Sequence, residues 1–153
     1  MNIEPARFIV PTGSASTHSG FLLGMRARGC NVPVHGVCVR RDGASQQQRV
    51  SKKMNSVIAA IGCDISIADA EIICDDSQLA PGYGLPNANT VAAIKYMARH
   101  EGILLDPTYS GKTFALLLDL LRRGDFGADE HVVFLHTGGA VSLFGYPELV
   151  AED

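Results

Sequence analysis

Apolar residues occur along this chain in two patterns, short dense runs and longer stretches with helical spacing. The dense runs lie at residues 8–10, 32–39, 71–75, 102–106 and 131–136. A short run in which nearly every side chain is apolar is typical of a strand that helices cover on both faces. The five runs therefore predict five strands of a largely parallel sheet.

The stretches between these runs carry apolar residues every three or four positions, which predicts helices. The expected helices cover residues 21–28, 46–61, about 90–98 and 113–123. Asp42 to Ser45 can cap the second helix, and Asn89 or Thr90 the third. Strands that alternate with helices predict a doubly wound, mostly parallel α/β sheet with right-handed crossovers. A chain of 153 residues fits one domain.

Four loops rich in glycine, proline and small hydroxyl residues fall at predicted strand ends or helix starts. They cover residues 11–17, 80–90, 107–111 and 137–145. In doubly wound sheets, ligands bind beyond the carboxyl ends of the strands. We therefore expect a binding site where these loops meet.

The first of these loops, Thr12 to Gly20, connects a predicted strand to a predicted helix. Backbone N–H groups and the positive end of the helix dipole would converge there, which favours a bound phosphate. Serine and threonine also simply cap helices, so this loop alone fits a binding site or an ordinary connection equally well.

Composition and charge exclude several function classes. A net charge of −3 without a basic block argues against a nucleic-acid partner. We expect a cytoplasmic protein without membrane contact, because there is neither a signal peptide nor an apolar run of about 20 residues. Metal-binding patterns of cysteine and histidine are missing, so no metal site is expected. The cysteines are expected to be buried free thiols: Cys30, Cys38, Cys63 and Cys74.

With the four loops in view, the chain resembles the D-cysteine desulfhydrase and 1-aminocyclopropane-1-carboxylate (ACC) deaminase family of tryptophan synthase β-like pyridoxal-phosphate enzymes. The blocks that carry the resemblance are Gly13 to Gly20, Tyr83 to Asn87, Leu105 to Lys112 and His136 to Gly139. The resemblance covers nearly the whole chain but only about the carboxyl-terminal half of such an enzyme. It implies that residues 1–153 form one incomplete pyridoxal-phosphate-binding domain, part of the enzyme's large domain.

The resemblance also implies roles for individual residues. The cofactor phosphate would be received by Gly13, Ser14, Ala15, Ser16 and Thr17, where Ala15 and Ser16 replace frequent glycines of the family. Tyr83 and Tyr109 match two catalytic tyrosines that move or accept protons, and Ser110 and Thr137 match positions near the pyridine nitrogen. Relatives that open the cyclopropane ring carry an acid at the position of Ser110, so the serine favours the desulfhydrase branch.

In this family the Schiff-base lysine and the small domain precede the phosphate loop, whereas here eleven residues without a lysine precede Thr12. Lys52, Lys53 and Lys95 have ordinary surface patterning, and Lys112 belongs to a helix start. The resemblance therefore implies the cofactor-cradling portion of a D-cysteine desulfhydrase-like lyase, as a fragment or one product of a split gene. Such a lyase performs an α,β-elimination that gives pyruvate, ammonia and sulfide.

Alone, this portion is expected to bind pyridoxal phosphate non-covalently at most and to be inactive. A sheet cut from a larger one leaves an unpaired edge, so we expect self-association or a complementing chain. A small amino acid would be the substrate once an amino-terminal half completes the site. The alternative is a non-catalytic α/β domain that binds a phosphorylated ligand or a partner chain.

Overall fold

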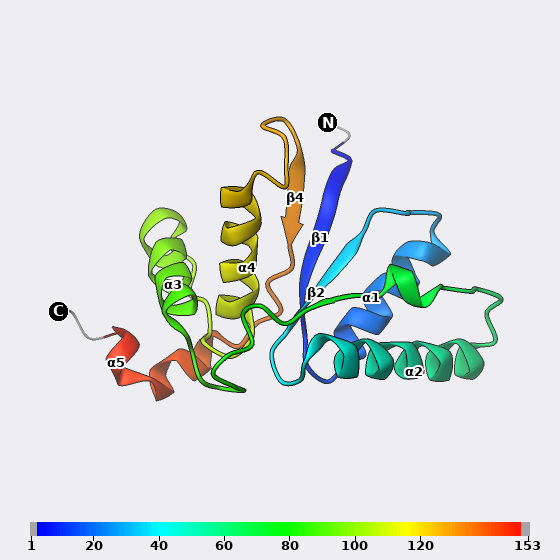
Figure 1. The fold of residues 1–153 in the computed structure, drawn as a ribbon, viewed down its shortest axis with the longest axis horizontal. Helices are drawn as coiled ribbons and strands as arrows, with labels where there is room; N and C mark the ends of the chain where they lie inside the picture. Colours follow the sequence, from blue (N-terminus) through cyan, green and yellow to red (C-terminus); the bar gives the residue numbers. More distant parts are fainter. Residues whose placement is uncertain (1–2, 151–153) are drawn as a thin grey trace.

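The protein forms one four-stranded parallel sheet, seen in a computed structural model that describes residues 3–150 (Figure 1). Its strands are β1 (Pro5–Thr12), β2 (Val34–Cys38), β3 (Ile73–Asp75) and β4 (His131–Phe134). The order across the sheet is β3-β2-β1-β4, and every neighbouring pair is parallel. The predicted parallel α/β sheet is confirmed.

Helices cover both faces of this sheet. The longer ones are α1 (Ser16–Ala27), α2 (Gly43–Ile61), α3 (Ala88–Glu101) and α4 (Ser110–Arg123). Two short 3-10 helices and a final short helix are η1 (Asp69–Glu71), η2 (Ala140–Gly145) and α5 (Pro147–Val150). Helices α3 and α4 lie on one side of the sheet and α1 and α2 on the other (Figure 1). None of the helices in residues 3–150 combines the length and apolar character that a membrane crossing requires.

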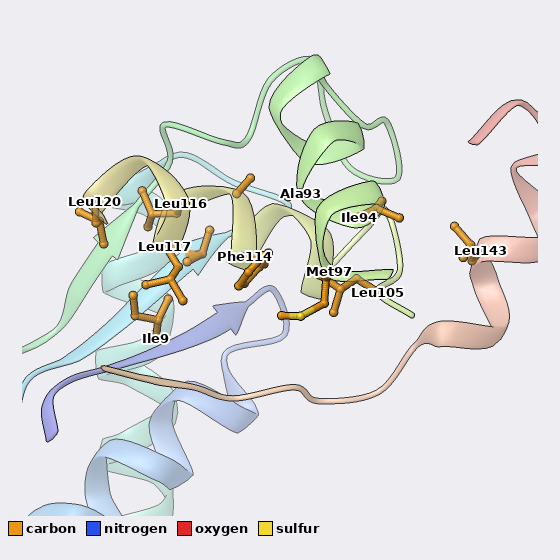
Figure 2. Packing of buried hydrophobic residues seen from close by; sticks show 12 residues of the cluster. Ile9, Ala93, Ile94, Met97, Leu105, Phe114, Leu116, Leu117, Leu120 and Leu143 are labelled. Carbon is orange, nitrogen blue, oxygen red and sulfur yellow. The ribbon is translucent and has the colours of Figure 1, made fainter. Parts of the chain in front are cut away.

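The two faces of the sheet have separate hydrophobic cores, because successive side chains of a strand point to opposite faces. Ile9 of β1 packs against Leu116 and Leu117 of α4 and belongs to the core under α3 and α4 (Figure 2). The next residue, Val10, belongs to the core under α1 and α2. Each core buries a strand face and a helix face together, which explains the dense apolar runs in the sequence.

Residues 102–106 do not form the strand that the sequence predicts. This segment has no regular secondary structure, although Leu105 is fully buried. Ile103 and Leu104 are 45% and 42% exposed. The segment contacts the residues after β4 through a hydrogen bond between His136 Nε2 and the Leu104 carbonyl oxygen, 3.2 Å apart. A strand requires a backbone ladder, and in residues 3–150 β4 has one only with β1.

Helix starts also differ from the sequence prediction. The cap of α3 is Asn87, whose side chain accepts a hydrogen bond from the Thr90 N–H, so the prediction of Asn89 or Thr90 was wrong. Asp42 caps α2 as expected, accepting from the Ser45 N–H at 2.8 Å. Helices α1 and α4 begin five and three residues earlier than predicted, because small hydroxyl residues and glycine form their first turns.

Candidate functional site

The strand order creates a switch point beside β1, because the chain continues from β1 toward β2 and β3 on one side and later adds β4 on the other. The carboxyl ends of β1 and β4 lie together at the lower edge of the sheet (Figure 1). A cavity of about 250 Å³ opens at this point. It is lined by Pro11, Gly13, Ser14, Ala15, Thr17, His18, Tyr109, Thr137, Gly138 and Gly139.

One wall of the cavity is the loop between β1 and α1. Ala15 has the left-handed backbone conformation, with φ 77° and ψ −13°, and stands immediately before the first turn of α1. The first N–H groups of a helix lack intrahelical partners and attract anions. A Cβ atom on Gly13 would lie 2.9 Å from Val39 Cγ2 and 3.6 Å from Tyr109 Cε1, so only glycine fits there without displacing a neighbour. The loop therefore has the form of an anion cradle.

Side chains from α2 and the turn before it hold this cradle in place. Gln46 is fully buried and donates from Nε2 to Thr12 Oγ1 at 2.7 Å. Arg41 Nη1 donates to the Gly13 carbonyl oxygen at 2.8 Å, and Arg49 Nε donates to the Ser14 carbonyl oxygen at 3.3 Å. The two arginine bonds use carbonyl oxygens and the Gln46 bond uses the Thr12 hydroxyl, so none of the three occupies a backbone N–H group of the loop.

Two tyrosines lie at the site: Tyr109 lines the cavity, and Tyr83 contacts Tyr109. The hydroxyl groups of Tyr83 and Tyr109 are hydrogen-bonded to each other, and their rings meet edge to face with centroids 5.9 Å apart. This hydrogen bond and partial burial raise the pKa of Tyr109 to about 12. The Arg40 guanidinium lies 5.6 Å from the centre of the Tyr83 ring. The two phenol groups therefore lie side by side, although Tyr83 is 49% exposed.

The loop that carries Tyr83 is fastened by a buried lysine. Lys112 has no exposed surface, and its Nζ donates to the carbonyl oxygens of Leu79 at 2.6 Å and Gly82 at 2.9 Å. Burial lowers the pKa of Lys112. The Tyr146 hydroxyl adds a 2.6 Å bond to the Gly84 carbonyl oxygen. The ammonium group of Lys112 thus holds the loop of Tyr83 by hydrogen bonds and does not line the cavity.

The start of α4 is organised by Asp106, which sequence reasoning did not single out. Its buried carboxylate accepts hydrogen bonds from the N–H groups of Thr108, Tyr109 and Ser110 at 2.7–2.9 Å and from Ser110 Oγ at 2.6 Å. Ser110 Oγ also accepts from the Asp106 N–H. A Cβ atom on Gly139 would lie 2.9 Å from the same carboxylate, which brings the loop after β4 against α4.

Most of the predicted site residues line one cavity. Gly13, Ser14, Ala15, Thr17, Tyr109 and Thr137 do so, whereas Tyr83 reaches the site through Tyr109 and Ser16 follows in the first turn of α1. Ser110 is fully buried with its hydroxyl bonded to Asp106, so it does not line the cavity. Sequence reasoning missed Pro11, His18, Gly138 and Gly139 as lining residues. These residues could have been found from their position next to the carboxyl ends of β1 and β4.

Among the residues that the structure describes, no lysine lines this cavity. Lys52 and Lys53 border a shallow hollow on the outer side of α2 together with Arg49, and Lys95 lies on α3. Among residues 3–150, no group of three or more His, Cys, Asp or Glu side chains could hold a metal ion. All four cysteines are free, but only Cys38 is buried, so burial was wrongly expected for the other three.

The cradle and the hydroxyl groups opposite it suit a phosphorylated ligand, and comparison with known proteins identifies the family. The family model described as "Pyridoxal-phosphate dependent enzyme" matches residues 1–138. The chain belongs to this family. The residues present fit the phosphate end of such a cofactor, because a helix start, a tight glycine and a left-handed turn converge there.

Curated relatives are D-cysteine desulfhydrases. The protein of Yersinia pestis (strain Pestoides F) is 39% identical over 145 residues, which are 95% of this chain and 43% of the relative. The protein of Klebsiella pneumoniae is 41% identical over 138 residues, which are 90% of this chain and 41% of the relative. The chain thus spans about two fifths of the length of these relatives.

Among solved structures, the crystal structure of an ACC deaminase homologue superimposes with a TM-score of 0.81 at 26% identity. The match covers 98% of this chain and 45% of that chain. The fold is therefore part of a tryptophan synthase β-like enzyme, as the sequence predicted.

Proposed function

We propose that this chain supplies the phosphate cradle and the tyrosine pair of a pyridoxal-phosphate-dependent lyase of the D-cysteine desulfhydrase type. The observation that carries the proposal is the convergence of the cradle, Thr137 and Tyr109 on one cavity at the switch point of the sheet. The relatives named above support the substrate class, a small amino acid with a sulfur leaving group. The expected reaction takes up one water and gives pyruvate, ammonia and sulfide.

Pyridoxal phosphate, when bound, supplies the electron-accepting ring on which such eliminations depend. The N–H groups of residues 14–17 and the Thr17 hydroxyl would hold its phosphate. Thr137 would present a neutral hydroxyl to the ring. Ser110 remains a predicted site residue that would first have to release its bond to Asp106.

The tyrosine pair would handle protons at the substrate side of the cavity. With its pKa raised to about 12, Tyr109 keeps its proton at neutral pH, and its action as a proton donor would require this pKa to fall toward the working pH. Tyr83 is bonded to it and can share that proton. The Arg40 guanidinium beside Tyr83 provides positive charge near the position where an anionic substrate would enter.

We further propose that the 153-residue chain by itself does not catalyse the reaction, because no lysine lines the cavity. The test is to mix the purified chain with pyridoxal phosphate, reduce with borohydride and map adducts by mass spectrometry, with sulfide release from D-cysteine assayed in parallel. We expect cofactor absorbance changes without a stoichiometric lysine adduct or turnover. A stoichiometric adduct with turnover would overturn the inactivity of the chain.

A competition experiment tests whether the cofactor binds through its phosphate group. Inorganic phosphate should compete with pyridoxal phosphate, because both would use the same N–H groups. If neither ligand binds at millimolar concentration, the cradle does not function in this chain and the proposal fails.

The uncovered surface supports a partner for this chain. The outer edge of β4 has no ladder partner in residues 3–150, and Val141 and Phe144 are 83% and 71% exposed. Unpaired edges and apolar patches of this kind favour association. We propose self-association or a complementing chain that brings the lysine. Light scattering after size-exclusion chromatography should show oligomers, and a stable monomer over a wide concentration range would contradict self-association.

A further inference from the structure

A cluster of polar side chains lies on the α1 and α2 face of the sheet, beneath the cradle, and the proposed function does not use it. Its members are His18 in the first turn of α1, Cys38 at the end of β2 and Cys74 in β3. We refer to these three residues as the sulfur–imidazole cluster.

The register of the sheet brings these groups together. Gly36 of β2 is paired with Cys74 of β3, so a side chain at either position points to the same face. A Cβ atom on Gly36 would lie 2.4 Å from both Cε1 and Nδ1 of His18. The imidazole therefore occupies the space that a side chain at Gly36 would fill, directly beside Cys74. Cys38 follows Gly36 by two positions and points to the same face.

His18 has an unusual polar environment for a buried side chain. It has no exposed surface, and neither ring nitrogen has a hydrogen-bond partner among the described residues. A buried polar group without a partner costs about 1–3 kcal/mol. A negatively charged sulfur beside the ring would compensate this cost, and the Cys74 thiol is the adjacent group that can ionise.

The electrostatics of Cys74 agree with the geometry. Contact with Cys38 lowers the pKa of the Cys74 thiol to about 6, with help from His18 and His35 and against the effect of burial. The same contact raises the pKa of Cys38, so Cys74 is the group that ionises.

The other charged groups near Cys74 do not change which of the two cysteines ionises. Asp75 points to the opposite face, where its Oδ2 is 3.4 Å from His35 Nε2. Asp76 accepts a 2.7 Å hydrogen bond from the Gly43 N–H of α2. Helix α2 adds the neutral Gln47, which donates to the Ile72 carbonyl oxygen.

We propose that Cys74 is a site of thiol modification that reacts as the thiolate with low-molecular-weight disulfides. Its sulfur forms a mixed disulfide with one half of the reagent, and the S–S bond of the reagent breaks to release the other half as a thiolate. Cys74 is partly exposed on the outermost strand, so reagents reach it, whereas Cys38 is fully buried.

Modification of Cys74 also affects the cradle. His18 is both a wall residue of the 250 Å³ cavity and the neighbour of Cys74, so a group attached to Cys74 displaces the imidazole and with it the first turn of α1. This second step rests on the proposed function, whereas the reactivity of Cys74 does not.

The reactivity is tested on the full chain with iodoacetamide at a series of pH values, using peptide mass spectrometry to follow each cysteine. The midpoint of the rate profile reports thiolate formation independently of accessibility. We expect a midpoint near 6 for Cys74, below the value of about 8.5 that is usual for a free thiol, with the partly exposed Cys30 and Cys63 followed as internal references. At pH about 6, Cys74 should react about tenfold faster than these references, after allowance for its lower intrinsic nucleophilicity.

The His18→Gln variant should raise the midpoint of Cys74, and His131→Gln, which changes an exposed residue of β4, should leave it unchanged. A Cys74 midpoint equal to those of Cys30 and Cys63 in the unmodified sequence would overturn the proposal, whether or not His18→Gln folds.

The coupling to the cradle is tested with oxidised glutathione, which contains the required disulfide. We expect the treated chain to bind inorganic phosphate and pyridoxal phosphate at least about tenfold more weakly, and reduction to restore binding. Cys74→Ser, treated in the same way, is the control and should keep its affinity. Unchanged affinity after quantitative modification of Cys74 would overturn the coupling. If the untreated chain binds neither ligand, the proposed function fails while the thiol profile still decides the reactivity.

Discussion

The two walls of the cavity are built in different ways. The cradle wall consists of backbone between β1 and α1, which is held by Gln46 of α2 and by Arg41 in the turn before it. The tyrosine wall consists of side chains from a long loop and the start of α4, and Tyr83 on it is half exposed. A binding element made of backbone is completed by local folding, whereas one made of side chains depends on the elements that support it. We therefore expect substitutions to disrupt the tyrosine wall more easily than the cradle wall.

The caps of the neighbouring helices show the same contrast. On the cradle side, the exposed Asp42 caps α2 with a bond to a single N–H group, that of Ser45. On the tyrosine side, the buried Asp106 accepts from three N–H groups and a hydroxyl. The second arrangement concentrates more of the local stability in one residue.

The largest effect is expected from Asp106→Ala, which leaves three buried N–H groups at the start of α4 without their acceptor. We expect a loss of about 3 kcal/mol or more in the free energy of unfolding, since hydrogen bonds to charged groups contribute about 1.5–3 kcal/mol each and water can replace only part of them. Urea denaturation followed by circular dichroism measures the loss.

Asp42→Ala is the matched control, because it removes the corresponding cap from the cradle side. Its effect should be less than half of that of Asp106→Ala, since the Ser45 N–H can turn to solvent. Equal losses for the two variants would show that the walls do not differ in this way.

The sequence allowed the sheet to be predicted better than its boundaries. Runs such as 32–39 are apolar because helices cover both faces of β2, whose residues are all buried, and that cause is visible in the composition of the strand. The run 102–106 has the same composition, yet it stays outside the sheet because no strand in residues 3–150 offers it a backbone ladder. Hydrogen-bond partners are not encoded in a local apolar pattern.

A smaller effect, and one on binding, is expected from Gly13→Ala in the cradle wall. The new methyl group would meet Val39 Cγ2 at 2.9 Å, so the loop or Val39 must move. We expect about 1–2 kcal/mol of destabilisation and about tenfold weaker binding of pyridoxal phosphate, measured by absorbance titration.

Gly24→Ala in α1 separates this steric effect from the general effect of alanine. No atom lies within 4 Å of the position of its new methyl group, and the residue is exposed in the middle of the helix. We expect about 0.5–1 kcal/mol of stabilisation and unchanged binding. Weaker binding in this variant as well would argue against a specific role of the Gly13 contact.

The site was predictable where it depends on chain order and was missed where it depends on packing. Gly13 to Thr17 could be placed because a loop between a strand and a helix has a fixed relation to the sheet. His18 could not, because its role comes from contact with Gly36, which lies more than fifteen residues away in the sequence. Asp106 was missed for another reason: its partners Thr108 to Ser110 are local, but the sequence does not show that its carboxylate is buried and accepts all of these hydrogen bonds.

A third prediction concerns protons on the tyrosine wall. In Tyr83→Phe, the pKa of Tyr109 should fall from about 12 toward its ordinary value of about 10, because the hydroxyl of Tyr83 is the largest cause of the increase. Ultraviolet titration of tyrosinate measures this shift, with Tyr96→Phe as the control. The raised pKa means that the folded state holds its proton more tightly than the unfolded state, so this contribution to stability is lost as pH rises from about 10 through about 12. A Tyr109 pKa that stays near 12 in Tyr83→Phe would contradict the pairing.

The smallest effect is expected from Ala15→Gly, which relieves backbone strain in the cradle and removes a buried methyl group. A residue with a side chain costs about 1–2 kcal/mol in the left-handed conformation, and Ala15 adopts it with φ 77°. Glycine removes that cost, but it loses a buried methyl group worth about 0.8 kcal/mol and gives the unfolded chain more freedom, worth about 0.4–1 kcal/mol.

These contributions nearly cancel, so the free energy of unfolding should change by less than about 0.5 kcal/mol in thermal or urea denaturation. Binding of inorganic phosphate should be equal or tighter, because the backbone can approach the anion more closely without the methyl group. A clear loss of affinity would show that the Ala15 methyl group itself shapes the cradle, and the cradle wall would then depend on side chains as the tyrosine wall does.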